Sequence, residues 1–116
     1  MLRLAMAVCL GAVVMSLAGC GNSEAVLIND LKQVGLAYHN YHDANQKGPA
    51  NWEELIKFEQ ETGGDGASIQ RVRAAGYQMK WDAKFSELPE GLANTTMAEK
   101  AGGGPTLMMD GGVVRR

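Results

Sequence analysis

The chain has 116 residues, which is room for one domain, and its hydrophobic fraction of 46% is ordinary for a globular protein. The formal net charge is −2 and the 11 Lys and Arg residues are scattered, so the composition argues against a nucleic-acid-binding protein. Both cysteines, Cys9 and Cys20, lie near the N-terminus, which excludes a disulfide framework or a cysteine-based zinc site in the rest of the chain.

The first segment has the layout of a secretory signal peptide. Arg3 is followed by an uncharged apolar run over residues 4–17, and small residues close the run. The run is shorter than the roughly 20 residues that an apolar helix needs to cross a bilayer. We therefore expect residues 1–19 to be a signal peptide that is removed on export together with Cys9.

Residues 17–20, Leu-Ala-Gly-Cys, closely resemble the lipobox of bacterial lipoproteins. The resemblance implies that Cys20 is acylated on its sulfur, for example with palmitate, becomes the first residue of the mature chain, and is then acylated on its amine. The alternative is an unmodified Cys20 thiol in an uncleaved anchor. Because two or more acyl chains hold a protein stably on a membrane, residues 20–23 would form a lipidated tether. This tether would keep a domain at 24–116 within about 10 Å of the bilayer.

The stretch from Glu24 to Ala44 predicts one long amphipathic helix, because at about 100° per residue its apolar side chains fall in one stripe. The stripe consists of Leu27, Leu31, Val34, Tyr38 and Tyr41, with Ile28, Gly35 and His42 along its edge. Its burial would contribute on the order of 10 kcal/mol before conformational entropy is subtracted. Gly35 costs about 1 kcal/mol in helix propensity, which a close approach between the helix and a sheet would offset.

Two shorter helices are predicted after a turn at Pro49. Asn51 as N-cap and Glu54 three residues later have the pattern of a capping box, and the helix that they begin should end near residue 60. A glycine-rich loop follows. Ser68 is then expected to cap a brief helix that ends at residue 75.

The hydrophobic period changes to two after these helices. Tyr77, Met79 and Trp81 alternate with polar residues, which predicts a half-buried strand. A strand with a weaker pattern is predicted over residues 94–100.

The end of the chain predicts a hairpin. Residues 106–109 read as a strand, and Asp110-Gly111 favours a type I′ or bulged turn into a last strand at 112–115. Three or four short antiparallel strands would form a small sheet whose apolar face is covered by the stripe of the long helix. The predicted fold class is therefore α+β.

A long N-terminal helix, a Pro-containing loop, a short helix and an antiparallel sheet, in this order, resemble the globular domain of type IV pilins and type II secretion pseudopilins. The sequence is closer still to the pilin-like domains of unknown function that are abundant in planctomycete bacteria. The segments that carry the resemblance are LKQVGLAYHNYHD at 31–43, Gly-Pro-Ala at 48–50 and LMMDGGV at 107–113. The resemblance implies the fold of the head, with Gly35, Pro49, Asp110 and Gly111 at structural positions.

The chain departs from the pilin pattern at its N-terminus. Pilins carry a prepilin peptidase site and a long apolar helix, whereas this chain has a lipobox and a short tether there. The predicted helix is also too polar to lie in lipid, since Asn29, Asp30, Lys32 and Gln33 occur within it. The resemblance therefore implies the fold of the head domain, argues against assembly into a pilus, and supplies no reaction.

His39 and His42 are weak candidates for a metal site. The two imidazoles lie at i and i+3, next to Asp43, and could share a metal ion. No third ligand at a recognised spacing accompanies them. His42 falls on the apolar stripe, which favours a packed histidine bonded to the sheet or to the loop at 48–51.

Other candidate sites have simpler structural explanations. Asp65 and Asp82 could contribute to a calcium site, but no EF-hand spacing is present and solvated turn aspartates are the default. Trp52 and Trp81 could form a binding patch, although aromatic residues at the start of a helix or in a strand are more often core residues. We expect no catalytic residue and no cofactor.

These observations together predict a lipid-anchored cell-envelope protein that is a structural or protein-interaction module and not an enzyme. Its expected partners are the membrane, through Cys20, and envelope or secretion-system proteins, with the head on the periplasmic or outer side. The first alternative is an accessory pseudopilin that contacts a secretion or pilus machine through the exposed side of the long helix. The second alternative is a metal-binding protein that uses His39 and His42.

Overall fold

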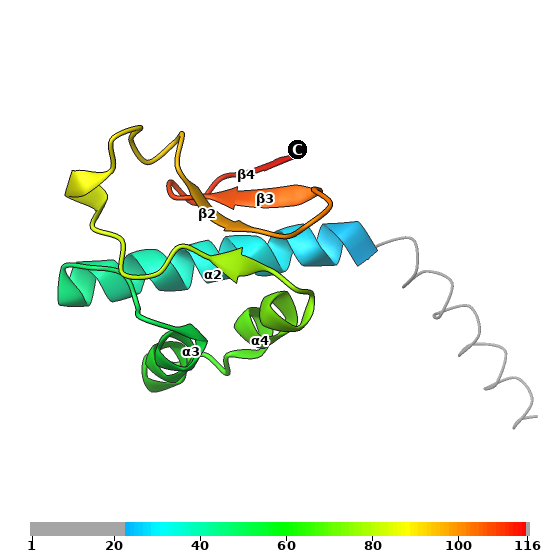
Figure 1. Ribbon diagram of the computed structural model, residues 1–116. Helices are drawn as coiled ribbons and strands as arrows, with labels where there is room; N and C mark the ends of the chain where they lie inside the picture. The colour runs from blue at the N-terminus through cyan, green and yellow to red at the C-terminus, as the bar shows by residue number, and fades with distance from the viewer. Residues whose placement is uncertain (1–22, 116) are drawn as a thin grey trace, which may run out of the picture.

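The structure is a computed structural model that describes residues 23–115 (Figure 1). The helices are α2 (Ser23–Asn45), α3 (Trp52–Glu61), α4 (Ala67–Ala74) and the 3₁₀ helix η1 (Phe85–Glu87). The strands are β1 (Gln78–Met79), β2 (Thr96–Glu99), β3 (Pro105–Met108) and β4 (Val113–Arg115). This order confirms the predicted α+β fold. The predicted signal peptide (1–19) and Cys20 lie outside the described residues.

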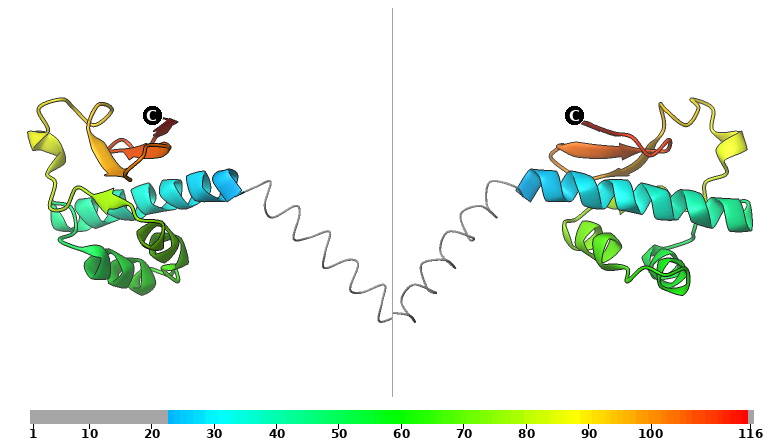
Figure 2. Two further views of the ribbon diagram at one scale, coloured as in Figure 1. Left: turned by 45° about the vertical axis from the view of Figure 1, so that its right-hand side comes forward. Right: turned by 180° about the vertical axis from the view of Figure 1, so that it is seen from behind.

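The long helix α2 runs between two layers. The sheet covers one side of α2, and α3 and α4 pack on the other side (Figures 1 and 2). In the predicted stripe, Leu31, Val34 and Tyr38 are fully buried, whereas Leu27 and Tyr41 are half-buried. The buried residues that join them in one core are Leu55, Ile69, Val72, Tyr77, Ala83, Met97, Ala98, Leu107 and Met109. The buried part of the stripe therefore shares one core with the sheet, as predicted. The layer formed by α3 and α4 is an additional cover, and Tyr41 packs on Phe58 of α3.

The sheet has the order β1-β2-β3-β4, and all neighbouring strands are antiparallel. The register between β2 and β3 shifts at Met97, because Thr96 pairs with Met108 while Ala98 pairs with Leu107. This bulge leaves both Met97 and Ala98 buried. A strand with two successive buried residues lacks simple alternation, which explains the weak pattern of β2 in the sequence.

The turn between β3 and β4 is a bulged turn and not a type I′ turn, the other type that Asp110-Gly111 favoured. The N–H of Gly111 donates to the carbonyl of Met108 (2.9 Å), and the N–H of Met108 donates to the carbonyl of Gly112 (2.8 Å). Gly111 has φ +89°, whereas Asp110 is not in the left-handed region that a type I′ turn requires of both central residues.

Helix capping confirms one expectation and corrects two. Asn51 accepts from the N–H of Glu54 (2.8 Å), so it caps α3 as predicted. Glu54, however, accepts from the N–H of Ala50 (3.0 Å) and not from that of Asn51. The N-cap of α4 is Gly66 and not Ser68, because Gly66 adopts φ +75° and α4 begins at the next residue.

Candidate functional site

His39 and His42 both contact the ring of Phe85. The His42 imidazole stacks on it, with centroids 3.8 Å apart and an interplanar angle of 3°, and the His39 imidazole lies 4.7 Å from it at 48°. Phe85 begins η1, so the two histidines pack the C-terminal half of α2 against the segment that follows β1. This stacking accounts for the position of His42 on the apolar stripe.

Each histidine also uses its Nε2 atom for a hydrogen bond to the main chain. His39 Nε2 lies 2.5 Å from the carbonyl oxygen of Met109, which can only accept, so this nitrogen carries the proton. His42 Nε2 accepts from the N–H of Phe85 (3.1 Å), so the other nitrogen carries the proton in the neutral ring. His42 therefore bonds to η1, which corrects the expectation of a bond to the sheet or to the loop at 48–51.

These bonds bear on the metal hypothesis. A metal ion shared by His39 and His42 would have to bind through the two Nδ1 atoms or displace at least one of the two main-chain bonds. In the described part of the chain, no group of three or more His, Cys, Asp and Glu side chains is placed to hold a metal ion. Metal binding by the pair stays the untested second alternative.

The two aspartates considered for calcium each have a partner in the fold. Asp65 Oδ1 accepts from the N–H of Ala67 (2.9 Å) at the start of α4. Asp82 forms an exposed ion pair with Lys47 (3.8 Å). Asp65 thus makes a capping contact at the start of α4, and Asp82 makes an ion pair at the surface, which fits the expectation of solvated turn aspartates.

Gly35 is a point of close approach between α2 and the hairpin. A Cβ atom at Gly35 would lie 3.2 Å from Leu107 Cδ1 and 3.4 Å from Gly111 Cα. Asp110 stabilises the turn here, since its Oδ1 accepts from the N–H of Gly112 (2.8 Å). Gly35, Asp110 and Gly111, singled out by the family resemblance, thus meet at one helix–hairpin contact.

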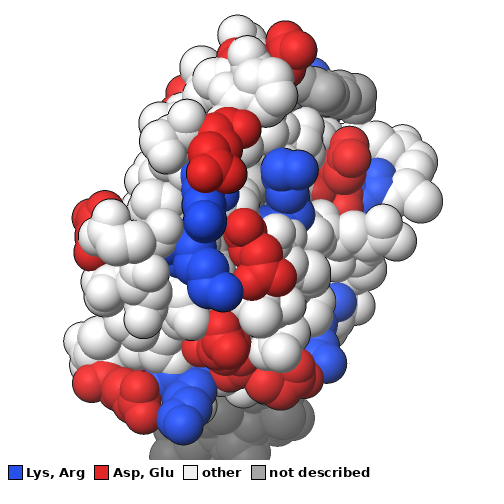
Figure 3. All heavy atoms as spheres, turned by 60° about the vertical axis from the view of Figure 1, so that its left-hand side comes forward, with Lys and Arg blue, Asp and Glu red and all other residues white. Residues whose placement is uncertain are grey.

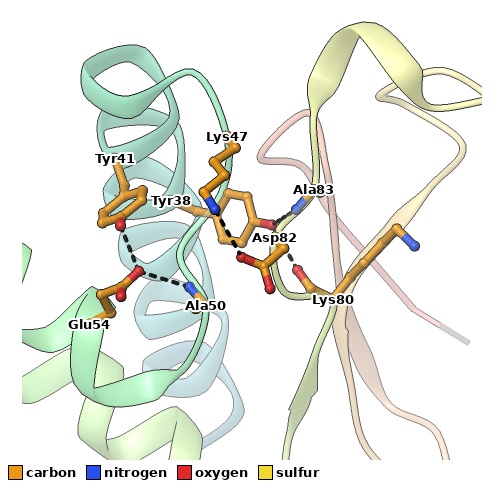
Figure 4. Close-up of polar contacts among 8 residues, drawn as sticks. All are labelled: Tyr38, Tyr41, Lys47, Ala50, Glu54, Lys80, Asp82 and Ala83. Atoms are coloured by element: carbon orange, nitrogen blue, oxygen red, sulfur yellow. Dashed lines mark hydrogen bonds and ion pairs between the residues drawn. The ribbon is translucent and has the colours of Figure 1, made fainter.

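Tyr38 organises the contact between α2 and two loops (Figure 4). Its hydroxyl donates to the carbonyl of Lys80 (2.7 Å) and accepts from the N–H of Ala83 (3.2 Å). Burial raises the pKa of Tyr38 to about 12, so the hydroxyl stays a donor at neutral pH. Pro49, the fourth motif residue, is buried nearby, and its carbonyl accepts from the N–H of Asp82 (2.8 Å). Tyr38 and Pro49 therefore hold the two loops side by side.

Two polar contacts attach α3 and α4 to α2. Tyr41 donates to Glu54 Oε1 (2.6 Å), which lowers the pKa of Glu54 and raises that of Tyr41 to about 12 (Figure 4). Asp30 receives two hydrogen bonds from Arg71, at 2.8 and 2.9 Å, and these lower its pKa. The Asp30 side chain is 4% exposed, so a carboxylate at this position depends on Arg71 for compensation.

We use the term open face of α2 for the exposed stripe that neither layer covers. It consists of Asn29, Lys32, Gln33, Leu36, Asn40 and Asp43. Leu36 is 57% exposed and stands between two hollows. The first, of about 320 Å³, lies against the hairpin and is lined by Lys32, Gly35, His39 and Asp110 among others. The second, of about 170 Å³, lies against α3 beside Phe58 and Glu59.

Charged side chains of both signs are mixed on the face that Figure 3 draws, where Lys and Arg side chains interleave with Asp and Glu side chains. The ion pairs Lys47–Asp82 and Arg73–Glu53 are examples of this mixing. By contrast, the open face of α2 carries one positive and one negative side chain, Lys32 and Asp43.

Among the described residues, no helix is both long enough and apolar enough to cross a membrane. Cys20, the predicted lipidation site, lies outside this part of the chain. No family model, curated protein or solved structure matches the chain.

Proposed function

We propose that the chain is a lipid-anchored cell-envelope protein whose α+β head is a protein-interaction module without a catalytic step. The observation that carries this proposal is the Leu-Ala-Gly-Cys sequence at 17–20, at the end of an apolar run. Because α2 begins at Ser23, Gly21 and Asn22 alone separate Cys20 from the folded head. Acyl chains on Cys20 would therefore keep α2 close to the lipid surface.

The open face of α2 is the surface that we assign to the partner protein. Interface centres are depleted of charge and contain well-packed apolar anchors. Leu36 is an exposed apolar side chain between two hollows, in a stripe otherwise composed mostly of neutral amides. A partner side chain could enter either hollow while its neighbours cover Leu36.

An accessory pseudopilin is the second candidate. The open face of α2 favours it, because this face runs along the long helix through which such a protein would contact a secretion or pilus machine. The proposed head and anchor are the same for both candidates. The two differ in the identity of the partner protein.

Fatty-acid labelling in cells tests the anchor. The wild-type chain should incorporate the label, and Cys20→Ser should abolish it. A wild-type chain that is exported but remains unlabelled would contradict the proposal.

Photo-crosslinking tests the partner surface. A photoreactive residue at Leu36 should capture an envelope protein in intact cells, whereas the same residue at the exposed Lys57 on α3 should not. Recovery of secretion or pilus components would favour the second candidate. Equal capture at both positions, or none at Leu36, would contradict the role of the open face.

A further inference from the structure

Two tryptophans form a half-exposed pair at the surface. Trp52 is the first residue of α3, and Trp81 follows β1. Their ring centroids lie 5.1 Å apart and the rings are nearly perpendicular, at 82°. The sequence pattern favoured core positions for both, but neither is fully buried. Two tryptophan side chains are therefore partly open to solvent at one place.

The indole N–H groups are available to a ligand. Neither the Trp52 indole nor the Trp81 indole makes a hydrogen bond with a residue in the described part of the chain. Buried side-chain donors in that part all have partners, so both N–H groups reach solvent. An indole N–H can only donate, and a buried one usually finds an acceptor in its own fold. The pair thus presents two unused donors.

An acidic residue follows each tryptophan and is held in an exposed ion pair. Glu53 pairs with Arg73 (2.8 Å), and Asp82 pairs with Lys47 (3.8 Å). A hydrogen bond from its own backbone N–H, together with Arg73, lowers the pKa of Glu53, so this carboxylate is ionised at neutral pH. Each ion pair is neutral as a whole, so the residues that follow the two tryptophans add no net charge beside them.

The backbone fixes the two tryptophans relative to each other. Asp82 has φ +57°, a left-handed conformation that costs a non-glycine residue about 1 kcal/mol. Its N–H donates to the carbonyl of Pro49 (2.8 Å), three residues before Trp52. Because the buried Tyr38 hydroxyl donates to the carbonyl of Lys80 and accepts from the N–H of Ala83, the segment is held on both sides of Trp81. A ligand would meet a largely preformed surface.

We propose that Trp52 and Trp81, with the carboxylates of Glu53 and Asp82, bind a neutral polyhydroxylated ligand, a saccharide segment of an envelope glycan. The C–H face of a sugar ring packs on an aromatic face, since the ring face is electron-rich. Sugar hydroxyls donate to carboxylates and accept from indole N–H groups. The absence of net charge disfavours an anionic or cationic ligand. The proposal relies on the proposed function only for the envelope location, which places such a glycan within reach.

The chain contains its own reporter for this site. Trp52 and Trp81 are the two tryptophans of the whole sequence, so intrinsic tryptophan fluorescence reports on this pair alone. We would titrate the purified full chain with tetra-N-acetylchitotetraose, a neutral oligosaccharide. A saturable change in tryptophan emission at millimolar concentrations is the expected result. No saturable change over that range would overturn the proposal.

Conservative variants separate binding from folding. Glu53→Gln and Asp82→Asn keep both indole rings and should each weaken binding about threefold to tenfold through one lost charge-assisted hydrogen bond. Glu61→Gln, which alters an exposed carboxylate at the far end of α3, is the matched control and should bind as the wild type does. Binding that is unchanged in both Glu53→Gln and Asp82→Asn would overturn the assigned site.

The test also separates this proposal from the proposed function. Cys20→Ser should bind the oligosaccharide as the wild type does, because the anchor is not part of the site. An unlabelled but sugar-binding chain would contradict the anchor alone. A photoreactive residue at Lys80, next to the pair, tests for a protein partner. If it captures a protein and the chain does not bind the oligosaccharide, the tryptophans belong to a protein interface and the glycan proposal is overturned.

Discussion

Gly48 lies directly against the ring of Tyr38, so that a Cβ atom at position 48 would be 2.5 Å from Tyr38 Cζ and 2.7 Å from Cε1. The ring cannot move away, because Tyr38 is fully buried and its hydroxyl bonds to the main chain on two sides. Gly48→Ala should therefore lower the free energy of unfolding by about 1–3 kcal/mol, the usual cost of overpacking a core.

Urea unfolding followed by circular dichroism measures this cost, and Gly64→Ala is the matched control. A Cβ atom at Gly64 would also be close to a side chain, 2.6 Å from Glu59 Cγ, but Gly64 is exposed and the Glu59 side chain can rotate into solvent. The control should change stability by less than about 0.5 kcal/mol. Equal effects of the two substitutions would show that Tyr38 is not rigidly held.

Tyr38→Phe tests the hydroxyl itself. The substitution keeps the ring but leaves the half-buried carbonyl of Lys80 and the buried N–H of Ala83 without their partner. We expect a loss of about 1–3 kcal/mol in the same unfolding assay. Tyr41→Phe, which removes a hydroxyl from the half-buried Tyr41–Glu54 contact, should cost less, because water can replace it there. A larger loss in Tyr41→Phe would contradict this ranking.

The Asp30–Arg71 pair should make stability depend on pH in the acid range. Arg71 lowers the pKa of Asp30 below its ordinary value of 3.8, so the stabilising contribution is complete above that value. It is lost as the pH falls through the lower pKa of the folded state. Asp30→Asn should therefore be less stable than the wild type by about 1–3 kcal/mol at pH 7, and the difference should shrink below about pH 4.

The exposed ion pair Glu53–Arg73 supplies the control for Asp30. Glu53→Gln removes a carboxylate with an equally short contact, 2.8 Å, but both partners are largely in water. Surface pairs of this kind contribute little to stability. Chemical unfolding at several pH values should thus show nearly parallel curves for Glu53→Gln and the wild type. A constant difference for Asp30→Asn between pH 7 and pH 2 would contradict the proposed linkage.

Zinc titration of the purified chain tests the metal hypothesis. We expect no stoichiometric uptake, because His39 and His42 each use Nε2 for a main-chain hydrogen bond. Isothermal titration calorimetry would detect one bound equivalent. Uptake of one zinc ion that disappears in both His39→Ala and His42→Ala would revive the metal-binding alternative.

The parts of the fold that follow from local periodicity could be predicted from the sequence. The long helix was expected over 24–44 and spans Ser23–Asn45, because its buried residues Leu31, Val34 and Tyr38 repeat at helical spacing. Asp110-Gly111 predicted the closing hairpin for a similar reason, since the left-handed glycine leaves a recognisable dipeptide.

Features that depend on distant or backbone partners could not be predicted. Asp30 and Arg71 are 41 residues apart, and no local pattern relates them. The partners of Tyr38 are main-chain atoms, which have no signature in a sequence. At α4, Gly66 rather than Ser68 became the N-cap because it can adopt a positive φ, and Ser68 instead accepts a hydrogen bond from Arg71 (3.3 Å). A carboxylate near the buried stripe needs a cationic partner, so Asp30 itself could have indicated a buried ion pair, although not that its partner is Arg71.

The proposed function depends on an acylated cysteine immediately before the folded head. Intact-mass analysis of the protein extracted from membranes, followed by sequencing of its N-terminal peptide, tests it most directly. We predict a chain that begins at Cys20 and carries the mass of two or three acyl groups, all of which are absent from Cys20→Ser. A chain that begins at another residue, or a Cys20 with a free thiol, would contradict it.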